Sequence, residues 1–71
     1  RYEEALVALE AYDRLLPGDA GITFLRGVSL EGLGRRQEAA RLYADVLQRS
    51  GGQGQAAAYA RQRLRQWGYL R

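Results

Sequence analysis

The chain has 71 residues, 46% of them hydrophobic and 27% charged, which is the composition of an ordinary globular domain. It contains no Cys and no His, which excludes disulfides, thiol nucleophiles and the usual zinc and haem ligands. The formal net charge of +3 is small for a protein that binds nucleic acid. We therefore expect one small domain without a cofactor or metal, whose core is marginal without neighbours.

Three further features bear on the source and the compartment. All eleven basic residues are Arg, a bias that favours a GC-rich, bacterial genome. No apolar run approaches the roughly 18 residues of a membrane-spanning helix, so we expect a soluble protein of the bacterial cytoplasm or periplasm. Because the sequence starts at Arg1 without Met or a signal peptide, we expect it to be a piece of a longer protein.

The first predicted helix covers residues 1–16, where apolar side chains recur mostly at intervals of three and four. The stripe consists of Tyr2, Ala5, Leu6, Leu9, Tyr12 and Leu16. This spacing places them on one face of a helix with 3.6 residues per turn. Pro17 cannot continue the helix, and Asp19 is a suitable N-cap for the next one.

Two further helices are predicted at residues 20–33 and 36–49. Their apolar residues are Ile22, Leu25, Val28, Leu30 and Leu33 in the first, and Ala39, Ala40, Leu42, Tyr43, Val46 and Leu47 in the second. Gly34 supplies a left-handed stop between the two helices, so we expect a positive φ there.

A fourth helix is predicted at residues 55–67, after the loop-like sequence SGGQGQ. Its apolar stripe consists of Tyr59, Ala60, Leu64 and Trp67, and Gly68 ends it. No strand-like alternation occurs anywhere in the chain. We therefore predict an all-α fold of about four short antiparallel helices.

The sequence also contains an internal repeat. Similar residues recur at the separation of Ala5 and Ala39, which we call the repeat offset. Identical residues at this offset are Arg1 and Arg35, Glu4 and Glu38, Ala5 and Ala39, Gly18 and Gly52, Leu30 and Leu64, and Gly34 and Gly68. The number of identities is only modestly above chance, but each helix, turn and stop falls on its counterpart. A helix–turn–helix period of this length, about 34 residues, is that of the tetratricopeptide repeat.

Residues 24–47, FLRGVSLEGLGRRQEAARLYADVL, resemble one complete tetratricopeptide repeat. The matching positions are Gly27, Leu30, Gly34, Ala39, Tyr43 and Val46. Residues 1–17 resemble the second helix of a preceding repeat, 20–50 the complete repeat, and 55–71 a terminal or capping helix. The chain departs from the family pattern at Thr23, Gly51 and Arg61, and the last departure favours a terminal helix.

The resemblance implies antiparallel helix pairs stacked as a right-handed superhelix, with a concave groove lined by the first helix of each pair. In this register the candidate partner-binding groove consists of Phe24, Val28, Glu31, Gly32, Ala58, Gln62 and Arg65, with Gly21, Gln55 and Gln66 beside them. Because Phe24 and Val28 are apolar, we predict a protein-interaction scaffold that docks a partner peptide or helix on an apolar spot with an Arg and Gln margin. Phe24 as a simple core residue is an equally weighted interpretation.

Residues 24–47 contain three glycines, and each has its own interpretation. Gly27 fits the close approach of two paired helices, and Gly34 fits the turn between them. Gly32 has no packing reason in this register. Two interpretations stay open: its place on the groove would let a ligand backbone come close, or the glycine is neutral drift.

Two other functions remain open, and enzyme activity is not expected. The serines have no base nearby, and the carboxylates Glu3, Glu4, Glu31 and Glu38 fit solvated or Arg-paired positions on helix faces. One alternative is an architectural segment of a larger protein that self-associates through its exposed repeat ends. The other, a minor one, is weak RNA binding by the basic C-terminal helix through Arg61, Arg63, Arg65 and Arg71.

Overall fold

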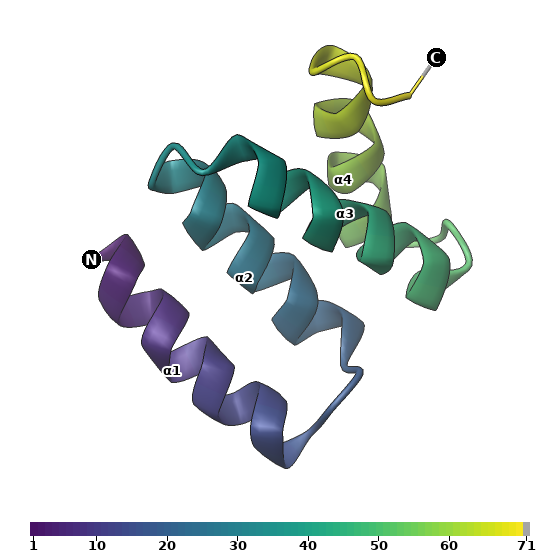
Figure 1. Cartoon of the computed structure of the whole chain (residues 1–71). Coiled ribbons are helices and arrows are strands. Elements are labelled where there is room, and N and C mark those ends of the chain that lie inside the picture. Colours follow the sequence, from purple (N-terminus) through teal and green to yellow (C-terminus); the bar gives the residue numbers. More distant parts are fainter. Residues whose placement is uncertain (71) are drawn as a thin grey trace.

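Four helices make up the computed structural model, which describes residues 1–70. They are α1 (Tyr2–Leu15), α2 (Ala20–Gly32), α3 (Arg36–Ser50) and α4 (Gln55–Gln66). Figure 1 shows α1, α2 and α3 running antiparallel to their neighbours in chain order, with α4 beside α3 at the end of the molecule away from α1. The described residues contain no strand. The all-α prediction is confirmed, and every predicted helix bound lies within one residue of the observed one.

The predicted start and stop signals act as expected around α2. The carboxylate of Asp19 accepts a 3.0 Å hydrogen bond from the backbone N–H of Ile22, which satisfies one of the free donors of the first turn. After α2, Gly34 has a φ of 80°, in the left-handed region that a side chain would strain. The predicted N-cap and the predicted positive φ are both confirmed.

The correspondence at the repeat offset is present in the backbone as well as in the sequence. After α2 the N–H of Arg35 donates to the carbonyl of Leu30 at 2.9 Å, and after α4 the N–H of Tyr69 donates to that of Leu64 at 2.8 Å. The first residues of α1 and α3 are related by the repeat offset, and so are the last residues of α2 and α4. The chain therefore repeats one helix–turn–helix geometry, including the hydrogen bonds that close its helices.

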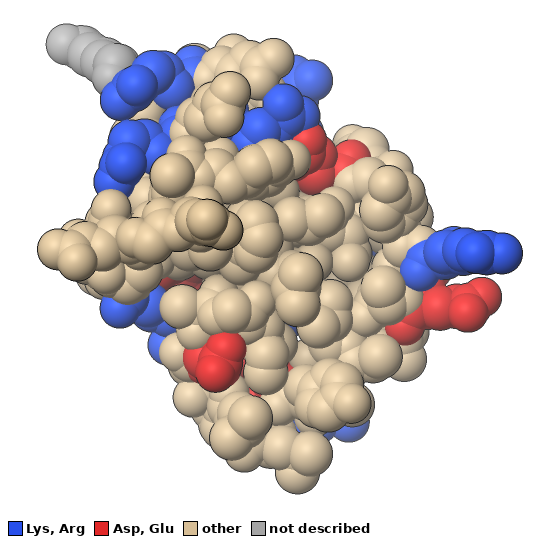
Figure 2. Space-filling model, turned by 180° about the vertical axis from the view of Figure 1, so that it is seen from behind, with Lys and Arg blue, Asp and Glu red and all other residues tan. Residues whose placement is uncertain are grey.

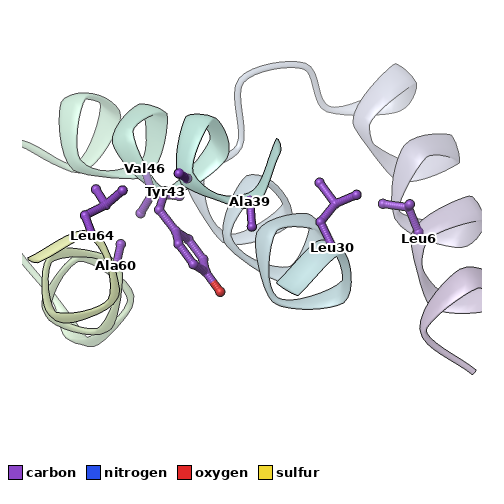
Figure 3. Close-up of a cluster of buried hydrophobic side chains, with 8 residues drawn as sticks. Leu6, Leu30, Ala39, Tyr43, Val46, Ala60 and Leu64 are labelled. Carbon is purple, nitrogen blue, oxygen red and sulfur yellow. The ribbon is translucent and has the colours of Figure 1, made fainter. Parts of the chain in front are cut away.

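The core lies mainly where α2, α3 and α4 meet, and Figure 3 shows its buried side chains. Tyr43 and Val46 of α3 are the largest fully buried side chains. A Cβ on Gly27 of α2 would lie 2.7 Å from Cε1 of Tyr43, closer than real contacts allow. The prediction that Gly27 permits a close helix approach is confirmed, and its neighbour is the Tyr43 ring.

Helix α1 buries much less than its apolar stripe predicts. Leu6 is its one buried residue and points toward Leu30 of α2 (Figure 3), while Leu9 is half-buried. The rest of the stripe is exposed, including Tyr12 at 57%. The reason is that α1 contacts α2 and no other helix, so one side of its apolar face has no neighbour among the described residues. The helix is present as predicted, but most of its apolar stripe remains exposed.

Gly32 has a packing role that the sequence did not indicate. A Cβ at this position would lie 2.5 Å from the ring of Tyr2, the first residue of α1. The expectation that Gly32 lacks a packing reason was wrong, because the missing side chain makes room for an aromatic ring of the neighbouring helix.

Candidate functional site

Helices α2 and α4 contribute aromatic side chains to one cluster around Tyr43 of α3. The ring of Phe24 meets that of Tyr59 edge-on, with centroids 5.5 Å apart, and both rings lie about 6 Å from the ring of Tyr43. Trp67, the residue that follows α4, stacks on Tyr43 with centroids 5.9 Å apart. Aromatic contacts of this kind stabilise a structure by about 0.5–1.5 kcal/mol each beyond the area that they bury. The cluster fixes α4 against both earlier helices.

A charged network lies beside the aromatic rings. The hydroxyl of Tyr43 donates a 2.7 Å hydrogen bond to Oε1 of Glu31, and Arg63 of α4 binds the other oxygen of the same carboxylate as an ion pair. The Arg63 guanidinium lies 5.3 Å from the centroid of Trp67, within cation–π range. Glu31 therefore joins a residue of α3 to a residue of α4, and its carboxylate is fully engaged.

The protonation states of this network follow from its geometry. Burial raises the pKa of Tyr43 far above its ordinary value, and the hydrogen bond to Glu31 raises it further. The hydrogen bond with Glu31 also raises the pKa of Arg63, since the carboxylate favours the charged guanidinium. Tyr43 consequently remains a donor and Arg63 remains a cation at neutral pH.

The predicted groove residues fall into two groups in the structure. On α2, Phe24 and Val28 are half-buried beside the core. On α4, Ala58, Gln62 and Arg65 are exposed and line one shallow hollow, together with Arg61 and Gln66. This hollow is formed by α4 alone and does not include the α2 residues. Gly32 lies against Tyr2, at the side of α2 that faces α1.

Two residues outside the predicted groove connect these groups. Tyr59, which was assigned to the packing stripe of the fourth helix, is 38% exposed. Ala57, which was not assigned to that stripe, is fully buried. Arg63, which was named only among the basic residues of the C-terminal helix, contacts Glu31 of α2. The available signal was the opposite charge of Glu31 and Arg63, but the repeat offset alone does not say which side of α4 faces α2.

The basic residues of α4 are partly engaged by the protein itself. Arg63 is paired with Glu31, and Arg61 donates a 2.7 Å hydrogen bond to the carbonyl of Gly52. Arg65 is exposed, and Arg71 lies outside the described residues. Figure 2, which views the molecule from behind, shows arginine side chains gathered toward the end where α4 lies and a broad uncharged area next to them.

Metal sites and membrane spans are absent from the part of the chain that the structure describes. Within residues 1–70 no three acidic side chains lie close enough together to hold a metal ion. No described helix has the length and apolarity needed to cross a membrane.

Comparison with known proteins identifies no relative, since no family model, curated protein or solved structure matches the chain. We therefore classify the protein by its fold alone. Over residues 1–70 it is an all-α protein of four helices, in which one helix–turn–helix geometry recurs at the repeat offset.

Proposed function

We propose that the chain is a protein-interaction module of the tetratricopeptide type that binds a partner peptide across α2 and α4. The observation that carries the proposal is the contact between Phe24 and Tyr59 at 5.5 Å. It joins a half-buried apolar residue of α2 to a partly exposed ring of α4, so that the two helices present one continuous apolar strip. Exposed aromatic rings of this kind are typical anchors of protein interfaces.

The chemistry around the strip indicates which peptides fit. Gln62 and Arg65 are exposed on the same helix as Tyr59, and no acidic residue occurs anywhere after Asp45. The margin is therefore basic and rich in hydrogen-bond donors. A peptide with an apolar anchor residue for the strip and a carboxylate for Arg65 is the partner that this surface favours.

The structural repetition supports the assignment of the chain to the repeat class. The start of α1 recurs in α3, the end of α2 recurs in α4, and the hydrogen bond that closes α2 recurs after α4, as expected for stacked helix pairs. The resemblance to tetratricopeptide repeats remains the interpretation of this period, and the right-handed superhelix is part of the same proposal.

The experiment is a selection of peptides from a random displayed library, followed by calorimetry with the selected peptides. Tyr59→Ala is the test variant, and Tyr12→Ala is the matched control, since Tyr12 is also exposed but lies on α1. We expect Tyr59→Ala to weaken binding about tenfold or more, and Tyr12→Ala to leave it unchanged. Equal affinities for the two variants would place the binding surface elsewhere.

The architectural alternative has its own supporting observation. Tyr12, Leu15 and Leu16 are more than half exposed on the side of α1 that no described helix covers. Such a face suits contact with a neighbouring repeat. The RNA alternative is weaker in the structure, because Arg63 is held by Glu31 and its cation is thereby neutralised.

A further inference from the structure

The two ends of the molecule carry opposite charge. Helix α1 contains four acidic residues and one Arg, a formal charge of −3, while α4 contains three Arg and no acidic residue, a formal charge of +3. The two helices have no contact with each other and lie at opposite ends of a molecule about 33 Å long (Figure 1). The α2 residues Arg26 and Glu31 pair with Asp13 of α1 and Arg63 of α4, and the remaining charges of the two helices are not paired with each other.

An open hollow lies at the acidic end. Helices α1 and α3 both pack on α2 but do not contact each other, and the space between them is a hollow of about 540 Å³. Its apolar residues are Leu6, Val7 and Leu30. Four carboxylates and two guanidinium groups also line it, so that its formal charge is negative: Glu3, Glu4, Glu10 and Glu38, with Arg26 and Arg35. Val7 is 67% exposed, so part of the apolar surface is accessible to a partner.

Most of the carboxylates in this hollow are unpaired. The ion pairs among residues 1–70 are Arg26–Asp13, Arg35–Glu38, Arg49–Asp45 and Arg63–Glu31. Glu3, Glu4 and Glu10 thus have no cationic partner in the part of the chain that the structure describes. A partner with an Arg-bearing helix would supply the missing charges.

The internal repetition shows that this acidity is particular to the first hollow. A second hollow has the equivalent position between α3 and the segment after α4, and Gln37, Ala40 and Ala44 occupy the places of Glu3, Leu6 and Glu10. The geometry is repeated but the carboxylates are not. The carboxylates of the first hollow are therefore no requirement of the helix packing.

The complementary surface is the outward side of α4. The position of Arg61 corresponds to that of Gly27, over which the ring of Tyr43 packs in the preceding unit. Arg61 therefore keeps α4 from receiving a helix in the way that α2 receives α3. Its guanidinium and that of Arg65 line the exposed hollow of α4 with Gln62.

We propose that copies of this chain associate head to tail, with α4 of one copy in the acidic hollow between α1 and α3 of the next. The occupant is a second copy because the chain itself carries the basic helix that the hollow lacks, at the end where it cannot reach its own hollow. A contact between two different surfaces leaves one of each free, so that the association continues as an open chain. This proposal shares Gln62 and Arg65 with the margin of the proposed peptide site. It does not require Phe24 or Tyr59, so Tyr59→Ala distinguishes the two proposals.

Sedimentation of three proteins tests the proposal. The acid-end variant is Glu3→Arg with Glu10→Arg, the base-end variant is Gln62→Glu with Arg65→Glu, and the control is Arg41→Glu with Gln48→Glu on α3. The control changes the same residue types as the base-end variant and also at exposed positions. Circular dichroism verifies the fold of each variant, and Glu3→Gln with Glu10→Gln replaces the acid-end variant if the reversal prevents folding.

We expect the average mass of the original chain and of the control to grow past that of a dimer with concentration and to fall with added salt. Each end variant alone stays monomeric. An equimolar mixture of the two end variants associates again, because the mixture contains one intact end of each kind and the two reversed ends carry complementary charge. A chain that stays monomeric up to about 1 mM at low salt, a closed dimer, or a mixture that stays monomeric would overturn the proposal. Tyr59→Ala, which weakens peptide binding, leaves this association unchanged.

Discussion

Glu31 on α2 and Arg63 on α4 form an ion pair between residues far apart in the sequence, and the hydroxyl of Tyr43 on α3 donates to the same carboxylate. Both side chains of the pair are mostly buried, with 19% of Glu31 and 27% of Arg63 exposed. Three helices are thereby joined through one carboxylate. The pair also fixes the side of α4 that faces α2, and with it the position of Tyr59 next to Phe24.

Removal of Arg63 from the pair is expected to destabilise the protein. Arg63→Met keeps the length of the side chain but leaves the Glu31 charge with Tyr43 as its one protein partner. The cost of breaking a fully buried pair is about 3–5 kcal/mol, and partial exposure reduces our expectation to about 1–2 kcal/mol. Urea unfolding measures the loss. Arg65→Met is the control, and a similar loss in both variants would show that the pair has no special role.

Stability is expected to fall at alkaline pH because of Tyr43. Its pKa is raised in the folded protein above the ordinary value of about 10, so the native state holds the proton more tightly than the unfolded chain does. The stability from this difference is complete below about pH 10 and is lost as the pH rises above that value. Unfolding free energies between about pH 8 and pH 11, measured for the original chain and Tyr43→Phe, should show a smaller alkaline decline in the variant.

Gly27→Ala and Gly32→Ala are expected to change the stability of the fold by different amounts. At Gly27 the added Cβ meets the fully buried Tyr43 ring, whose hydroxyl is held by Glu31, so we expect overpacking of about 1–3 kcal/mol to exceed the helix-propensity gain of about 1 kcal/mol. At Gly32 it meets the ring of Tyr2, which is half exposed at the start of α1 and can move. Thermal unfolding should therefore show a clear loss for Gly27→Ala and a change near zero for Gly32→Ala.

Helix α1 is expected to be the least stable part of the fold. It buries one side chain, Leu6, and its Asp13 makes one ion pair with Arg26 at 3.6 Å. Amide hydrogen exchange should be faster in α1 than in α3, whose buried residues include Tyr43 and Val46. Leu6→Ala should increase the exchange of α1 with little effect on α3. Uniform protection across both helices would contradict this expectation.

Much of the fold could be predicted from the sequence because its signals are local. The spacing of apolar residues gave four helices, and Pro17, Asp19, Gly34 and Gly68 marked their ends. The exposed half of the α1 stripe could not be predicted, because periodicity identifies an apolar face but not whether a neighbour covers it.

The candidate site was harder to predict for a related reason. The repeat offset predicted one groove formed by residues of both α2 and α4. The α4 residues that it selected, Ala58, Gln62 and Arg65, instead line a hollow that does not include Phe24 and Val28 of α2. Tyr59 and Arg63 face α2 because the ring contacts and the Glu31 pair determine how α4 is rotated. Such contacts join residues that are distant in the sequence, and local spacing carries no information about them.

The most direct test of the proposed interaction surface is a chemical-shift map of the isotope-labelled chain with a selected peptide. We expect the amide signals of α2 and α4 around Phe24, Val28, Tyr59 and Gln62 to shift with increasing peptide, while those of α1 remain in place. Shifts confined to α1 and α3 would contradict the proposal that the partner binds across α2 and α4.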